Sequence, residues 1–178
     1  MMKFKKINIL AILTLGLLIT VTGCKKDDGP IKKKISIEDV PAMTMNLEPQ
    51  KLNNRDTIRL ASAASFSSKF KVDMVFPDAV KPTKVDIMVR KNGLATNVRL
   101  YKANITSFPT SFTINSAEIA TLFGAAHASN DTYDFAPDIY VGDKKYEAFP
   151  AVGLGVGAGV SNMSAIGFYE FVRIVVRP

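Results

Sequence analysis

Few residues of this sequence could carry out catalysis. His127 is the only histidine among the 178 residues, so any Ser-His-Asp or Cys-His relay would have to use it, and a metal site with two histidines is excluded. It lies in the alanine-rich stretch from Ala125 to Ser129, where a histidine is usually solvated. We therefore expect a protein that is not an enzyme.

Four aspartates offer the hard oxygen ligands that Ca²⁺ prefers: Asp131, Asp134, Asp138 and Asp143. Their spacing matches no EF-hand loop. Asp134 falls on an expected strand and Asp143 in an expected turn, so local geometry alone would not bring the carboxylates together. The sequence predicts no metal site.

Glycine recurs at every second position from Gly153 to Gly159, and Gly153-x-Gly155-x-x-Ala158 fits a relaxed dinucleotide fingerprint. That motif binds a pyrophosphate only where a strand passes into the N-terminus of a helix. Residues 160–167 show no helical pattern. We expect a flexible or close-packed connection here, and no cofactor.

Sugar rings are often bound by stacking on flat aromatic side chains, and the chain contains no tryptophan. Tyr140 and Tyr146 flank the turn Gly142-Asp143 and are the tyrosines best placed to form an exposed pair. Packing on a strand would explain them as well. They are the candidate ligand-binding residues, with a glycan as the candidate ligand.

Cys24, the only cysteine, follows a lysine-rich start and an apolar run over residues 7–21, which is the layout of a secretory signal. A helix of that run covers about 22 Å at ~1.5 Å per residue, less than the ~30 Å of a bilayer core, so a retained transmembrane helix is disfavoured. The stretch Val21-Thr22-Gly23-Cys24 resembles the lipobox of bacterial lipoproteins. The resemblance implies a signal peptide over residues 1–23, and a Cys24 whose thiol and new amino terminus carry fatty-acyl chains such as palmitate.

Residues 24–34 would then be the lipidated cysteine and a polar tether. Lys26-Asp27-Asp28 resembles the signal that sends lipoproteins of Bacteroidota to the outer face of the outer membrane. A plain solvated spacer explains these residues equally well. The expected location is the outer membrane, with the lipid anchor as the membrane contact and the cell surface as the expected face.

The charge balance is mildly basic, with 23 Lys and Arg against 16 Asp and Glu. Three of the lysines belong to the leader and the other basic residues are scattered, so we expect no nucleic-acid partner. A single cysteine permits no intrachain disulfide, and the exported chain must rely on its hydrophobic core. Residues 35–178 have the length of one domain.

Alternating apolar residues predict a mainly β structure. Asn92-Gly93 indicates a tight hairpin, and Gly142-Asp143 indicates a type II′ turn in a second hairpin. Asn115 followed by Glu118 indicates a capping box, and the short helix that it begins should end at Gly124. The expected strands are Phe70–Phe76, Val85–Arg90, 98–103, a strand from Ser111, the arms of the hairpin over 133–149, and Phe168–Val176.

The span Ile35–Phe66 is expected to supply one or two edge strands and a connector, one strand starting at Ile35 and Ile37 and another at Ile58 and Leu60. The whole pattern predicts an all-β fold, an immunoglobulin-like β-sandwich of about seven strands with one short helix. The residues expected to face the common core are Val72, Met74, Val85, Ile87, Val89, Phe112, Phe135 and Ile174.

The succession of these motifs from about Ala64 to Pro150 resembles the small surface lipoproteins of Bacteroidota that carry an immunoglobulin-like domain. They are akin to the amino-terminal domain of the SusE-like proteins of starch-utilisation systems. The resemblance implies the fold and the outer-membrane location. SusE-like proteins carry further sugar-binding domains, and this sequence departs from them by stopping after one domain.

We therefore expect a non-enzymatic surface lipoprotein that is an accessory or scaffold component of a nutrient-uptake or adhesion complex. Its partners would be outer-membrane uptake or adhesion proteins. The alternative is a lipoprotein of a polysaccharide-utilisation system that binds glycan directly.

Overall fold

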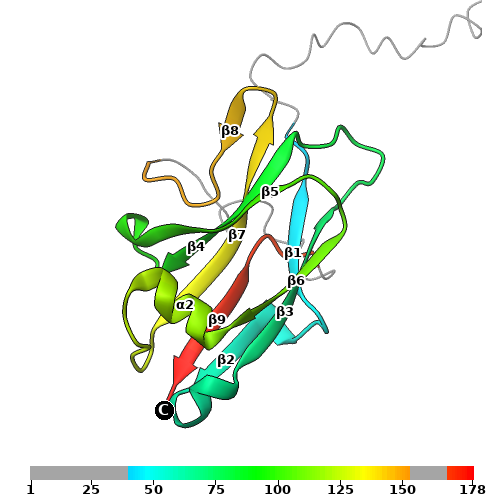
Figure 1. Cartoon of the computed structure of the whole chain (residues 1–178). Coiled ribbons are helices and arrows are strands. Elements are labelled where there is room, and N and C mark those ends of the chain that lie inside the picture. The colour runs from blue at the N-terminus through cyan, green and yellow to red at the C-terminus, as the bar shows by residue number, and fades with distance from the viewer. Residues whose placement is uncertain (1–39, 153–167) are drawn as a thin grey trace, which may run out of the picture. The chain divides into compact units, whose positions relative to one another are not determined.

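The apolar sides of two β-sheets face each other and enclose the core (Figure 1). The structure, a computed structural model, describes residues 40–152 and 168–178. The smaller sheet has the strand order β1-β3-β6, and the larger has the order β2-β9-β7-β4-β5, with β8 paired to β7. The strands are β1 (Met43–Leu47), β2 (Arg55–Arg59), β3 (Ser67–Met74), β4 (Lys84–Lys91), β5 (Val98–Ile105), β6 (Thr110–Asn115), β7 (Thr132–Val141), β8 (Lys144–Tyr146) and β9 (Val172–Arg177).

The strand order is that of an immunoglobulin-like sandwich. Strands β4, β7 and β9 take the positions of strands C, F and G, and β5 extends the sheet beside C as in variable-type domains. Strands β1, β3 and β6 take the positions of A, B and E. The expected all-β sandwich is confirmed, with nine strands described instead of about seven because β2 and β8 are short additions to the larger sheet.

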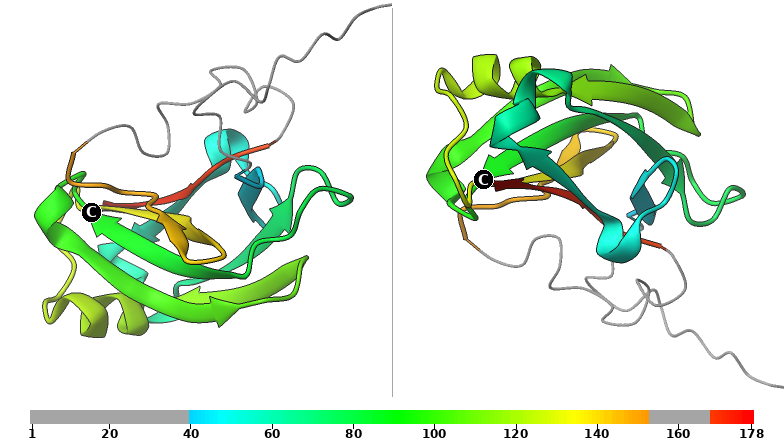
Figure 2. Two further views of the ribbon diagram at one scale, coloured as in Figure 1. Left: turned by 90° about the horizontal axis from the view of Figure 1, so that it is seen from above. Right: turned by 90° about the horizontal axis from the view of Figure 1, so that it is seen from below.

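One α-helix is described, α2 (Ser116–Phe123), together with the 3-10 turns η1 (Leu52–Asn54), η2 (Leu60–Ser65) and η3 (Ala95–Asn97). The α-helix directly follows β6 and lies beside β5 and β6 at one side of the sandwich (Figure 2). No helix within the described part of the chain is long and apolar enough to cross a membrane.

Alternation along the strands decides which side chains enter the core. In β3, Phe70, Val72 and Met74 are buried, while Lys69 is exposed and Lys71 and Asp73 are only partly covered. In β4, Val85, Ile87 and Val89 are fully buried. All eight residues predicted to face the core belong to the one large buried cluster.

Several local predictions about strand ends are wrong. The last strand was expected to begin at Phe168, but β9 begins at Val172. The ladder between β3 and β1 ends at the pair Met74 and Met43, so Phe76 is 63% exposed instead of buried. Asn92 and Gly93 both have the positive φ that their types suggest, but β5 first pairs with β4 through Val98, opposite Arg90. The connection therefore includes η3 and is not a two-residue hairpin.

The other hairpin and the helix follow their sequence signals. Val141 pairs with Lys144, which leaves Gly142-Asp143 as a two-residue turn, and Gly142 has a φ of 58°. Asn115 begins α2 with a complete capping box, and Gly124 ends it in the left-handed conformation. Strand β9 buries Val172, Ile174 and Val176, as the alternation predicts.

The span before Phe66 supplies two edge strands: β1 borders the smaller sheet and β2 borders the larger. Strand β2 contains Ile58 as expected but ends at Arg59, so Leu60 lies in η2, and β1 is a strand that the sequence did not predict. Asn54, directly before β2, links β1 to the start of β9, because its side-chain nitrogen donates to the carbonyl oxygens of Met45 and Phe171, both at 2.7 Å. The strand expected at Ile35 and Ile37 lies outside the described residues. So do the signal peptide, Cys24, the tether and the series Gly153–Gly159.

Candidate functional site

Tyr140 and Tyr146 lie on neighbouring strands but point to opposite faces of the hairpin. Tyr146 pairs with Ile139, whereas Tyr140 pairs with Lys145. Directly paired residues share a face and consecutive residues alternate, so Tyr146 lies on the side of Ile139, which packs against the core. The two rings therefore do not form one aromatic surface, and a ligand contact by either ring alone stays a prediction.

Tyr140 is surrounded by charged groups on the outer face of the larger sheet. The Nζ of Lys84 lies 4.3 Å from its ring centroid and the Nζ of Lys145 lies 6.0 Å away. Burial and a hydrogen bond with Asp86 raise the pKa of the Tyr140 hydroxyl. The cation of Lys84 therefore lies over one face of the ring, where a sugar could otherwise stack.

Three of the four aspartates considered as Ca²⁺ ligands, Asp131, Asp134 and Asp138, are each held by different partners. Asp134, only 1% exposed, accepts two hydrogen bonds from Arg173, at 2.6 and 3.0 Å, and one from Arg90 at 3.2 Å. Asp138 accepts from Lys145 at 2.9 Å and from the backbone nitrogen of Ala148 at 2.7 Å. Within residues 40–152 and 168–178, no three such side chains gather where they could hold a metal ion.

His127 is half-buried and hydrogen-bonded, so the expectation of a solvated histidine is wrong. Its Nε2 lies 2.8 Å from Ser116 Oγ and 3.1 Å from the Ser116 carbonyl oxygen. Its Nδ1 lies 3.0 Å from the Tyr133 hydroxyl, which donates to Asp131 Oδ2 at 3.3 Å. Burial and the Asp131 carboxylate raise the pKa of Tyr133, so this hydroxyl keeps its proton.

This chain of hydrogen bonds resembles a catalytic relay in composition only. Ser116 is 5% exposed, and both its hydroxyl and its carbonyl group face the same imidazole nitrogen. A nucleophile must reach a substrate, and Ser116 is almost fully buried. The hydrogen bonds among Ser116, His127, Tyr133 and Asp131 connect the start of α2 to β7.

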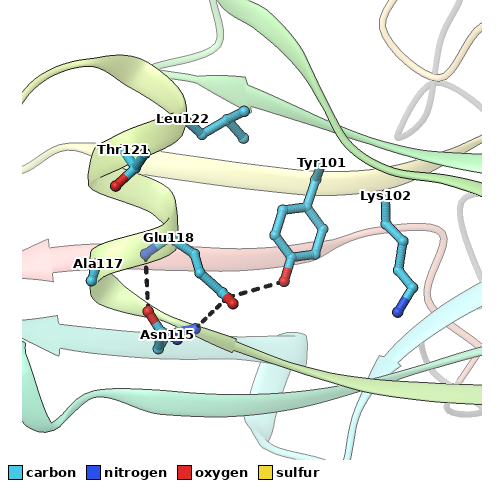
Figure 3. A pocket seen from close by; sticks show the side chains of 7 residues that line it. All are labelled: Tyr101, Lys102, Asn115, Ala117, Glu118, Thr121 and Leu122. Carbon is cyan, nitrogen blue, oxygen red and sulfur yellow. Dashed lines mark hydrogen bonds between the residues drawn. The ribbon is translucent and has the colours of Figure 1, made fainter.

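An open depression of about 660 Å³ lies between α2 and the edge strand β5 (Figure 3). We call it the α2–β5 depression. Strand β5 contributes Tyr101 and Lys102, and the end of β6 contributes Asn115, which leads into α2. The residues that line it are Tyr101, Lys102, Asn115, Ala117, Glu118, Thr121 and Leu122.

Glu118 connects the two walls of this depression. Its Oε2 accepts from the backbone nitrogen of Asn115 at 3.1 Å and from the hydroxyl of Tyr101 at 3.2 Å (Figure 3). The Asn115 side chain in turn accepts from the backbone nitrogen of Glu118 at 2.9 Å. Burial and the Glu118 carboxylate raise the pKa of Tyr101, so a proton donor stays next to the carboxylate.

The lining combines one aromatic side chain, one cation, one carboxylate, an amide and a hydroxyl. Packing holds the Tyr101 ring in place, because its centroid lies 5.8 Å from that of Phe112 and 5.7 Å from that of Phe135. Lys102 also lies near Phe112, with its Nζ 5.2 Å from the ring centroid. An open surface with fixed polar groups is suited to binding a hydroxyl-rich or polar partner.

No motif of the sequence indicates this depression. The capping box located Asn115 and Glu118, and alternation placed Tyr101 on a strand, but 17 residues separate Tyr101 from Glu118 and no motif links them. Only the packing of α2 against the strand edge brings the two side chains together.

Comparison with known proteins finds no matching family model, no similar curated protein and no similar solved structure.

Proposed function

We propose that this protein is a non-enzymatic lipoprotein of the outer membrane that serves as an accessory or scaffold component of a nutrient-uptake or adhesion complex. The observation that carries the proposal is the α2–β5 depression on an immunoglobulin-like sandwich. Sandwich domains present binding residues on a rigid frame, and here the frame holds Tyr101 and Glu118 in fixed positions. The lipobox-like Cys24 supports the membrane location.

The polar lining supports a second candidate function, direct binding of a glycan. Carboxylate, amide and hydroxyl groups hydrogen-bond sugar hydroxyls, and the Tyr101–Glu118 pair is already oriented by the core and by the capping box. The two functions would use the same depression and differ in the occupant.

One pair of variants tests the first function in cells. A photo-crosslinking amino acid at the exposed Thr121 should yield a discrete adduct with another envelope protein, identified by mass spectrometry. The same group at Leu52, which is 86% exposed and outside the depression, is the control. The adduct should disappear when Ala117→Arg fills the depression. Identical patterns from Thr121 and Leu52 would contradict the proposal.

Calorimetry with polysaccharide fragments tests the second function. If glycan is the occupant, Ala117→Arg should abolish binding, whereas Leu52→Ala, outside the depression, should leave it unchanged. Binding that survives Ala117→Arg would place the glycan elsewhere on the protein.

A further inference from the structure

The loop between β3 and β4 exposes an apolar surface at one end of the sandwich. Phe76 is 63% exposed, Val80 is 66% exposed, and Val40 beside them is 36% exposed. With Pro41, Ala42 and Ala79 these side chains line a hollow of about 280 Å³. We call this surface the apolar end.

The apolar end has a fixed backbone. Val75 donates to the carbonyl oxygen of Ala42 at 2.9 Å, and Ala79 donates to that of Phe76 at 3.0 Å. At the other side of the loop, Thr83 donates to the carbonyl oxygen of Tyr140 at 2.8 Å. The loop is therefore anchored to both sheets, and Phe76 and Val80 stay exposed. Soluble proteins rarely expose neighbouring large apolar side chains in this way, because their contact with water is unfavourable.

The chain enters the domain at this same end. Val40 is the first described residue and itself lines the hollow. Cys24 lies 16 positions upstream of Val40, a length that reaches at most ~58 Å when fully extended. If Cys24 carries a lipid anchor, the apolar end is the part of the domain closest along the chain to the bilayer, and the bilayer is present at a high effective concentration.

Charges around the apolar end are balanced. Lys81 and Asp78 are both exposed in the loop, and the adjacent hairpin turn, whose Gly142 donates to Thr83 Oγ1 at 2.9 Å, carries the exposed pair Asp143 and Lys144. The apolar end therefore carries no net charge that would attract anionic lipid. The contact would depend on the apolar side chains and on the interface between headgroups and acyl chains.

We propose that the apolar end, with Phe76 and Val80 at its tip, inserts into the interface of the bilayer that holds the Cys24 anchor. The inference rests on the lipid anchoring proposed above and adds a second membrane contact made by the folded domain. The contact would hold the sandwich in one orientation, because two attachment points restrict its rotation about the tether.

The absence of tryptophan from the chain makes the test direct. Phe76→Trp introduces a single fluorescent reporter into the full-length lipidated protein, reconstituted in phosphatidylcholine vesicles that contain lipid with a nitroxide near the headgroup. Leu94→Trp is the matched control. Leu94 is 52% exposed and follows the far end of β4, a strand of eight residues that spans about 26 Å.

We expect the emission of the Phe76→Trp protein to be quenched at least threefold more than that of the Leu94→Trp protein. Adding Val80→Asp should remove most of this difference, and raising the salt concentration or adding phosphatidylserine should change it little. Equal quenching of the two reporters would overturn the inference. A blue shift of the emission that depends on protein concentration and occurs without nitroxide quenching would also overturn it. A second copy or another protein would then cover the surface.

Mass spectrometry of the peptide that contains Cys24 separates this inference from the proposed location. A peptide without lipid would contradict both. A lipidated peptide together with an unquenched Phe76→Trp reporter would overturn only the membrane contact of the apolar end.

Discussion

Asp131 is a buried carboxylate that is stabilised in its charged form by several donors. Its oxygens accept from Lys91 at 2.8 Å, from the Asn92 side chain at 2.9 Å and from the backbone nitrogen of Ala128 at 2.9 Å. Burial alone would raise the pKa of this carboxyl group, but these hydrogen bonds outweigh the effect and lower the pKa to about 2. The residue therefore links the stability of the fold to pH.

We predict that Asp131→Asn lowers the free energy of unfolding by about 2 kcal/mol at neutral pH. An unfolded aspartate has a pKa of about 4, so the native state retains the charge to a lower pH than the unfolded state does. The stabilisation is complete above pH ~4 and is lost as the pH falls towards 2. Urea denaturation of both proteins at several pH values should show their difference shrinking over this range.

Asp78→Asn, in the exposed loop, is the control and should leave the unfolding free energy almost unchanged at every pH. A difference between wild type and Asp131→Asn that stays constant down to pH 2 would mean that Asp131 is not the titrating group.

Residue types alone indicated these ionisable groups but not their partners. His127 was expected to be solvated because its neighbours in sequence are alanines, yet Ser116 and Tyr133 reach it from α2 and β7. Likewise, Tyr140 and Tyr146 flank a turn in the sequence, and only the register shows that they face opposite sides. A hydrogen-bond partner that lies on another strand or helix cannot be predicted from the local sequence.

The helix α2 begins with a signal that the sequence does show. Asn115 and Glu118 each accept from the backbone nitrogen of the other, so two donors at the start of the helix are satisfied. Because Glu118 also accepts from Tyr101, the same box positions one wall of the α2–β5 depression.

We predict that Asn115→Ala destabilises the protein by about 1 kcal/mol, since the Glu118 backbone nitrogen loses its acceptor. Chemical denaturation followed by circular dichroism measures the change. Thr121→Ala, at an exposed position of the same helix, should be neutral or slightly stabilising because alanine favours helix. Equal effects of the two substitutions would show that the cap contributes nothing.

Hairpin turns were predicted well where the turn residues alone decide the geometry. Gly142-Asp143 forms the expected two-residue turn because Val141 and Lys144 pair directly. Asn92-Gly93 adopts positive φ, but the strand that returns from it starts only at Val98. Backbone preference is local, whereas the point at which a strand begins to pair depends on the partner strand.

At the scale of the molecule, aromatic rings join the two sheets. Phe70 of the smaller sheet and Phe135 of the larger one meet edge to face with centroids 5.2 Å apart, and Phe135 makes a similar contact with Tyr101 at 5.7 Å. Both phenylalanines are fully buried. The inward faces of these strands were predictable because alternation is a local pattern, but the pairing of the rings and the order of the strands were not.

We predict that Phe135→Ala lowers the free energy of unfolding by about 3–5 kcal/mol, because it leaves a cavity between the sheets. That is a large part of the ~5–15 kcal/mol that stabilises a typical domain. Arg99→Ala, on an exposed position of β5, should change it by less than about 0.5 kcal/mol. A Phe135→Ala protein with an unchanged denaturation midpoint would contradict the packing of the two sheets through this ring.

The last prediction separates the anchor from the fold. The strand pairs described for the sandwich lie between Met43 and Arg177, and Cys24 lies upstream of all of them in the sequence. Cys24→Ala should therefore move the protein from the membrane fraction to the soluble fraction without changing its thermal midpoint. The loss of a fatty-acid label from the protein reports the missing lipid. A labelled or membrane-bound Cys24→Ala protein would contradict the lipoprotein proposal. A midpoint lowered by several degrees, with both proteins measured in the same detergent and without a bilayer, would mean that the segment carrying Cys24 also stabilises the domain.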